Sequence, residues 1–130
     1  MLQRSIACDG VCATEKDLKM DWKAELAEAN ANLAAYRKAS PEGAAGFTGM
    51  SRAAMGAGAI GVKEKEFMCL SIGIARQCID CIGFHVKAAI AVGATRDEIA
   101  EVVTVAIYMG GGPSYMYAVK ALECYDQLTA

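Results

Sequence analysis

Large aromatic side chains and long apolar runs are both scarce in this sequence of 130 residues. Phe, Trp and Tyr make up 7% of the chain, although hydrophobic residues make up 55%. Much of the apolar content is Ala and Met, which suits close packing of helices and the burial of apolar surface between subunits. The apolar run 88–93 is far too short to span a bilayer, so we expect no membrane-spanning helix.

The chain also lacks a basic patch and a recognisable signal peptide. Its net charge is −2, so binding to nucleic acid is not expected. Arg4 is followed by Cys8, Asp9 and Cys12 rather than by an apolar core, and we therefore expect a cytoplasmic protein. In a reducing compartment, six cysteines are more often free, metal-bound or catalytic than paired as structural disulfides.

The sequence predicts an all-α fold, with about six helices in one domain that spans residues 1–130. No stretch alternates apolar and polar residues for long enough to indicate a strand. The expected helices cover residues 14–38, 41 to about 56, 62–77, 78–92, 96 to about 109 and 113 to about 128. The buried stripe of the third helix is expected to contain Phe67, Leu70, Ile74 and Met68.

Capping residues mark the ends of these expected helices. Thr14 precedes two acids and is a candidate N-cap, and Ser40-Pro41-Glu42 places Pro at the first helical position. Thr95-Arg96-Asp97-Glu98 has the pattern of a capping box. Gly93 stands where a glycine C-cap is expected.

One expected helix carries a cluster of reactive side chains, Cys78, Cys81 and His85. Their spacing of three and four residues places them on one face. The start of a helix and a nearby imidazole both favour a thiolate, and two thiols one turn apart can close a disulfide. The cluster therefore indicates redox chemistry. Inert packing and a zinc site remain alternatives, and zinc would need further ligands such as Glu66.

Glu66 is a candidate site residue because of a pattern that extends beyond its neighbours. Lys63, Glu64 and Lys65 by themselves indicate an exposed segment. The arrangement Glu66-x11-Cys78-x-x-Cys81-x-x-x-His85 resembles the carboxymuconolactone decarboxylase and alkylhydroperoxidase-D superfamily. It is most similar to the alkylhydroperoxidase-D-like branch. The resemblance includes the segments 93–99 and 108–113 and covers about 47–128, which leaves 14–38 as an N-terminal helical extension.

This resemblance implies an all-helical protomer that assembles into homotrimers or homohexamers. It also implies reduction of a hydroperoxide or a disulfide, with no bound cofactor and with an external reductant of thioredoxin-like or dihydrolipoyl type. By the same resemblance, Cys81 would attack the peroxide, Cys78 would resolve the product, His85 would pass a proton and Glu66 would orient His85. The decarboxylase branch lacks the cysteine pair.

Two other classes of function stay open on the sequence. His85 and Glu66 would be the acid and base of a lyase of the carboxymuconolactone decarboxylase type, with the cysteines incidental. Alternatively, the cysteine pair would belong to a redox sensor that is not an enzyme. Asp80 departs from the family pattern, and its carboxylate is expected to raise the pKa of a neighbouring thiol.

The remaining cysteines have different expected roles. Cys69 and Cys124 lie in apolar stretches of helix and are expected to be small core residues. Cys8 and Cys12 are expected either to form a second redox or intersubunit pair or to lie in a packed segment.

Overall fold

Six α-helices account for most of residues 19–130, the part of the chain that this computed structural model describes. The helices are α1 (Trp22–Ala39), α2 (Pro41–Met55), α3 (Val62–Ala75), α4 (Ile79–Ala91), α5 (Arg96–Gly110) and α6 (Gly112–Thr129). The prediction of an all-α fold is confirmed, and no strand occurs within residues 19–130. None of these six helices is long and apolar enough to cross a membrane.

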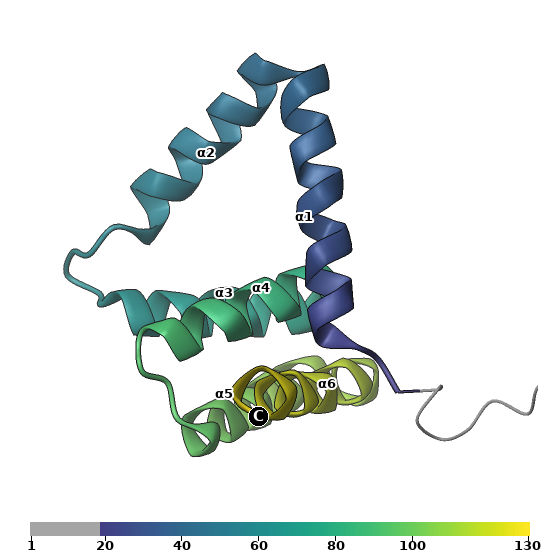
Figure 1. The fold of residues 1–130 in the computed structure, drawn as a ribbon. Coiled ribbons are helices and arrows are strands. Elements are labelled where there is room, and N and C mark those ends of the chain that lie inside the picture. Colours follow the sequence, from purple (N-terminus) through teal and green to yellow (C-terminus); the bar gives the residue numbers. More distant parts are fainter. Residues whose placement is uncertain (1–18) are drawn as a thin grey trace, which may run out of the picture.

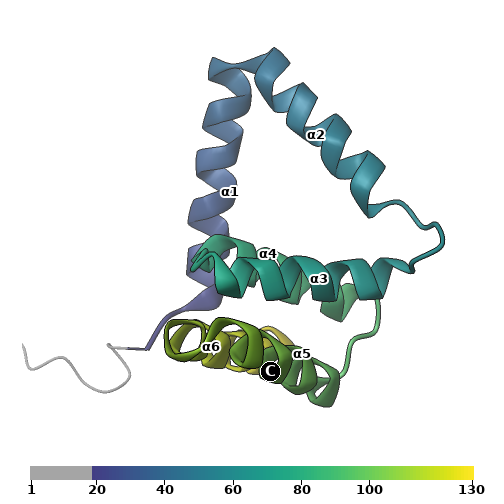
Figure 2. The same ribbon diagram turned by 180° about the vertical axis from the view of Figure 1, so that it is seen from behind.

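The helices form two stacked layers and a projecting arm. Helices α3 and α4 pack side by side over the pair α5 and α6 (Figure 1). Helices α1 and α2 rise from the upper layer and meet at their far ends, as the view from behind also shows (Figure 2). The upper layer is therefore contacted by the lower layer on one side and by the base of the arm on another.

Three of the predicted capping signals coincide with helix ends in the structure. Thr95 accepts the N–H of Glu98 at 3.2 Å, and the Glu98 carboxylate accepts the N–H of Thr95 at 2.9 Å, which completes the capping box. Pro41 begins α2, and Gly93 follows α4 with a φ of 87°. A glycine at that position avoids the steric penalty that a Cβ atom meets in the left-handed region.

One expected helix does not extend through residues 19–21, and one residue expected in a buried stripe is exposed. The first described helix begins at Trp22 because the Asp21 side chain accepts the N–H groups of Lys23 and Ala24, each at 3.0 Å. The expected helix start at Thr14 lies outside the described residues. Met68 is 48% exposed, so it points away from the buried stripe of α3.

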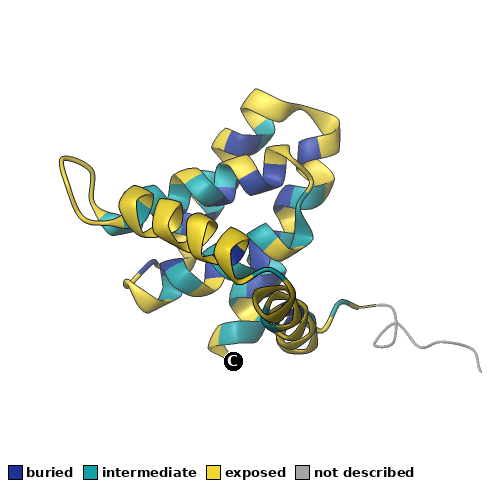
Figure 3. Cartoon of the chain, turned by 90° about the horizontal axis from the view of Figure 1, so that it is seen from above, coloured by how far each residue is buried: buried dark blue, intermediate teal, exposed yellow. Residues whose placement is uncertain are grey.

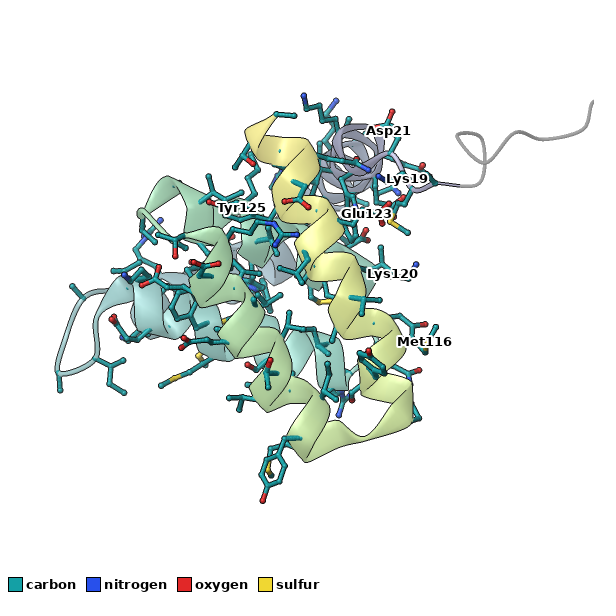
Figure 4. All side chains as sticks on the ribbon, turned by 90° about the horizontal axis from the view of Figure 1, so that it is seen from below. Lys19, Asp21, Met116, Lys120, Glu123 and Tyr125 are labelled. Atoms are coloured by element: carbon teal, nitrogen blue, oxygen red, sulfur yellow. A yellow bond between two sulfur atoms is a disulfide. The ribbon has the colours of Figure 1, made fainter. Side chains whose placement is uncertain are left out.

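Helix α1 is anchored to the two layers at its N-terminal end. Trp22 is fully buried. The Gln127 side chain accepts the backbone N–H of Trp22 at 2.9 Å and donates to the Met20 carbonyl at 2.8 Å. Figure 4 shows Lys19 and Asp21 beside the end of α6 that carries Glu123. The fixed start of α1 determines where the rest of that helix passes over α4.

Helix α2 and the turn between α5 and α6 expose many large apolar side chains. Ala44 is the one buried residue of α2, and this helix is largely exposed in Figure 3. Phe47 is 77% exposed, and Tyr108 at the end of α5 is 84% exposed. Others around the α5–α6 turn are Met109, Tyr115, Met116 and Val119.

We expect Gly83→Ala to destabilise the protein by about 1–3 kcal/mol, the usual cost of overpacking. A Cβ atom at Gly83 would lie 2.9 Å from Leu26 Cδ2 and 3.1 Å from Trp22 Cζ3, so α1 would have to move away from α4. The free energy of unfolding in urea measures the effect. Gly58→Ala is the control, because a Cβ atom there meets nothing within 4 Å. Equal stability of the two variants would contradict this account of the α1–α4 contact.

Candidate active site

The three-residue connection between α3 and α4 fixes the first cysteine. Gln77 has a φ of 57°, and it is the one residue other than glycine with a positive φ in the described range. Its N–H donates to the Ile74 carbonyl at 3.0 Å, and the Cys78 N–H donates to the Gly73 carbonyl at 2.9 Å. These two bonds form a Schellman motif, in which glycine usually occupies the position of Gln77. The chain therefore reverses in a few residues and enters α4 at Cys78.

Cys78 is also the N-cap of α4. Its Sγ accepts the N–H of Cys81 at 3.2 Å, and its carbonyl accepts the N–H of Ile82 at 3.0 Å. Cys78 and Cys81 are joined by a disulfide, and their Cα atoms are 5.2 Å apart. A sulfur at this place faces unpaired N–H groups and the positive end of the helix dipole, which stabilise negative charge. The spacing of the cysteines allowed such a disulfide, and the structure contains it.

A close approach of α3 to α4 occurs at the second cysteine. A Cβ atom on Gly73 would lie 3.0 Å from the Cys81 Cβ, so a larger residue at position 73 would force the two helices slightly apart. Cys81 and Gly73 thus bring the two helix backbones together. No local pattern in the sequence marks Gly73 for this contact.

The same two helices bring Glu66 to His85. The His85 Nδ1 lies 2.7 Å from the Glu66 Oε2, and Glu66 is 8% exposed. When His85 donates Nδ1–H to this carboxylate, its Nε2 is left to exchange a proton with another group. The neighbours of Glu66 indicate an exposed charge, but the contact with His85 buries it. The family pattern, rather than the local sequence, singles out this residue.

Two cavities adjoin Cys81 and His85. The larger one, of about 580 Å³, lies between α1, α2 and α4. Its lining consists of Ala29, Asn32, Leu33, Phe47, Ser51, Asp80, Cys81, Phe84 and His85. The smaller one, of about 200 Å³, lies between α3 and α4. Its lining consists of Cys69, Ile72, Gly73, Arg76, Cys81 and His85. Cys81 and His85 therefore contribute to both cavities, whereas Cys78 lines neither of them.

The sequence and the fold are both similar to those of known proteins. The sequence model of the carboxymuconolactone decarboxylase family matches residues 41–123, which include all four side chains of the cluster. The chain belongs to the carboxymuconolactone decarboxylase family. A crystal structure of the apo form of another carboxymuconolactone decarboxylase family protein, from Legionella pneumophila, is similar with a TM-score of 0.81 and 38% identity. That comparison covers 84% of this chain and 97% of the Legionella chain.

Two curated relatives support the same assignment. An uncharacterized protein of Cupriavidus necator is 38% identical over 110 residues, which cover 85% of this chain and 97% of the relative. An uncharacterized protein from the cox locus of Paracoccus denitrificans is 34% identical over 82 residues, which cover 63% of this chain and 74% of the relative. Neither name states an activity, so the comparisons establish the family and not the reaction.

Asp80 lies in the first turn of α4 and lines the larger cavity. Partial loss of hydration, together with a hydrogen bond to Asp80 and repulsion from it, raises the pKa of Glu25 on α1. Glu25 therefore lies close enough to Asp80 for the two carboxyl groups to interact. Their negative charge opposes the effect of the helix start on the neighbouring sulfurs.

The other cysteines divide into three cases. Cys124 is fully buried as expected, and burial raises the pKa of its thiol to about 12. Cys69 is only half-buried and lines the smaller cavity, so its assignment to the core is wrong. Cys8 and Cys12 lie outside the described residues. Within residues 19–130, no three Cys, His, Asp or Glu side chains gather as ligands for a metal ion.

We expect Gln77→Gly to stabilise the protein by about 1 kcal/mol, because the left-handed conformation costs roughly that much for a residue with a Cβ atom. The measurement is the free energy of unfolding of the oxidised protein. Gln77→Ala is the matched control, since alanine keeps the Cβ atom and with it the steric cost. A glycine variant that is no more stable than the alanine variant would refute the strain assigned to this turn.

Proposed function

We propose that this protein is a dithiol-dependent hydroperoxide reductase, with Cys78 and Cys81 as its redox pair and His85 and Glu66 as its proton relay. One observation carries the proposal. Cys81, which is disulfide-bonded to the helix N-cap Cys78, lines the same two cavities as His85, whose Nδ1 lies 2.7 Å from a nearly buried carboxylate. A redox-active sulfur and an oriented proton carrier therefore open onto common space.

The proposed reaction begins from the reduced pair. The Cys81 thiolate attacks one oxygen of the hydroperoxide, the O–O bond breaks, and the departing alkoxide takes a proton from His85 to leave as an alcohol. Cys81 is oxidised to a sulfenic acid, and the peroxide is reduced. The Cys78 thiol then attacks the Cys81 sulfur, which forms the disulfide and releases water.

An external dithiol resets the site. It attacks the disulfide through one thiolate, forms a mixed disulfide, and leaves as a cyclic disulfide when its second thiol attacks. The N–H of Cys81, which bonds to the Cys78 Sγ at 3.2 Å, stabilises a thiolate on Cys78 as the leaving group. The same exchange without a peroxide would be a disulfide oxidoreductase activity.

His85 and Glu66 have separate tasks in this scheme. His85 accepts the proton of Cys81 and later delivers it to the leaving oxygen. Glu66 holds one tautomer and one ring orientation of His85, as a carboxylate does in other imidazole relays. Its near burial keeps this bond away from competing water, because Glu66 is 8% exposed.

We expect Cys81→Ser to abolish peroxide turnover supported by a dithiol, and Cys78→Ser to lower it strongly because Cys78 is the first resolving thiol. Glu66→Gln should lower kcat/KM about 10–100-fold, the usual loss on removing such an orienting partner, and should leave the fold intact. Peroxide consumption with dihydrolipoamide as reductant measures all three. Glu64→Gln is the matched control, since Glu64 is an exposed residue of the same helix.

Each alternative function predicts a different result. A lyase that uses His85 and Glu66 as acid and base would keep its activity after both thiols are alkylated. A redox sensor would form the Cys78–Cys81 disulfide without catalytic peroxide consumption. Full turnover in Cys81→Ser would rule out the proposed reductase.

We further propose that copies of this chain cover the apolar patch around the α5–α6 turn. The patch contains Tyr108, Met109, Tyr115, Met116 and Val119, whose exposed fractions range from 44% to 84%. Patches of large exposed apolar side chains usually mark contacts with other subunits. A homotrimer or a homohexamer, which the family resemblance implies, would bury them.

Light scattering should therefore give a mass that is a multiple of the 13.7 kDa protomer. The double variant Tyr108→Glu and Met109→Glu should lower this mass toward that of the protomer, because burying two carboxylates opposes association. Val92→Glu is the control, since Val92 is an exposed apolar residue outside the patch. A wild-type protein at the protomer mass would refute the assembly.

A further inference from the structure

A third cysteine stands beside the proposed redox pair. Glu66, Cys69 and Gly73 follow one another on α3 at spacings of three and four residues, so they share one face of that helix. The first contacts His85, and the last approaches Cys81. Cys69 lies between these two contacts and therefore faces the segment of α4 from Cys81 to His85.

The smaller cavity connects Cys69 with that segment. Cys69, Cys81 and His85 all line this space of about 200 Å³. The Cys69 thiol donates to the Met55 sulfur at 3.7 Å, and Cys69 is only half-buried. Burial, with a contribution from the Glu66 carboxylate, raises the pKa of the Cys69 thiol. Cys69 is therefore a protonated thiol at rest rather than a competitor of Cys81 for peroxide.

We propose that Cys69 is a third redox thiol, which forms a disulfide with Cys81 across the smaller cavity whenever Cys78 is unavailable. The need for it rests on the proposed function, because Cys81 loses its resolving partner whenever the Cys78 thiol is itself oxidised. A peroxide that reaches Cys81 in that state would leave a sulfenic acid without its usual partner. Further oxidation of this acid is irreversible in most proteins.

The chemistry balances without another reactant. The Cys69 sulfur attacks the sulfur of the Cys81 sulfenic acid, the S–O bond breaks, and hydroxide leaves. The proton of the Cys69 thiol passes to His85 and then to this hydroxide, so that one disulfide and one water are formed. When Cys81 carries a mixed disulfide instead, the same attack expels the other thiol.

Cys81 rather than Cys78 is the partner for a structural reason. Cys78 is held at the N-cap of α4 by its backbone bonds and by the bond from the Cys81 N–H to its sulfur. Cys81 lies one turn into the helix and lines the cavity that Cys69 also lines. Once its bond to Cys78 is open, rotation about the Cys81 side chain directs its sulfur toward that cavity.

The test uses thionitrobenzoate, a coloured leaving thiol, in the full chain with Cys8→Ser, Cys12→Ser and Cys78→Ser. Serine is among the best N-cap residues, so the Cys78→Ser change preserves the start of α4. After reduction, the protein is treated with one equivalent of the aromatic disulfide dithiobis(nitrobenzoate). Cys124 remains as an internal control, because it is fully buried.

We expect two thionitrobenzoate molecules to be released per chain, together with a linked pair of peptides that contain Cys69 and Cys81. Adding Cys69→Ser should halve the release and leave one thionitrobenzoate on Cys81. Cys69→Ala should behave in the same way, which guards against an effect of serine on the fold. A stable adduct on Cys81 beside a free Cys69 thiol would overturn the proposal.

A second arm separates this proposal from the proposed function. The same Cys78→Ser protein, treated with one equivalent of hydroperoxide, should form the Cys69–Cys81 disulfide, whereas the variant with Cys69→Ser should retain a sulfenic acid that dimedone labels. Release of two thionitrobenzoate molecules without any reaction with hydroperoxide would support the role of Cys69 and refute the proposed reductase function. Dimedone labelling of Cys81 in both proteins would support the reductase and refute the role of Cys69.

Discussion

The close contact between α3 and α4 at Gly73 is the constraint on which the site depends. A side chain at this position would push α3 away from Cys81, because its Cβ would lie 3.0 Å from that of the cysteine. The tight turn through Gln77, the 2.7 Å contact between Glu66 and His85, and the cavity beside Cys69 all require the two helices to stay at this separation. One glycine thus sets the positions of groups far apart in the sequence.

Opposing electrostatic effects meet at the start of α4. The N–H groups of the first helical turn favour negative charge on the Cys78 sulfur, which accepts the Cys81 N–H. Asp80 and Glu25 add carboxyl groups at the same end of the helix, and the pKa of Glu25 is raised first by partial loss of hydration and then by Asp80. The donors bond directly to the sulfur and act at shorter range. Asp80 lines the larger cavity, where solvent screens its charge. The helix start and the carboxyl groups therefore act in opposite directions on a thiolate at Cys78 in the reduced protein.

The sequence predicts local features of this protein better than contacts between helices. Thr95, Pro41 and Gly93 mark helix ends because capping depends on residues within one turn. The burial of Glu66 and the cavity position of Cys69 depend on α4, which local spacing does not describe. Gln77 has no local sign of its left-handed conformation, since glycine is the usual residue there. The spacing of the cysteines and His85 predicted their common location, because these residues belong to one helix and its N-cap.

The residues proposed to react and one wall of the larger cavity come from different parts of the chain. The residues proposed to react lie on α3 and α4 or at the N-cap of α4, within the segment 41–123 that matches the family. Helix α1 precedes this segment, yet Ala29, Asn32 and Leu33 form one wall of the larger cavity. The packing of Trp22 and Leu26 against Gly83 holds this wall in place. The shape of the larger cavity therefore depends on a helix that carries none of the residues proposed to react.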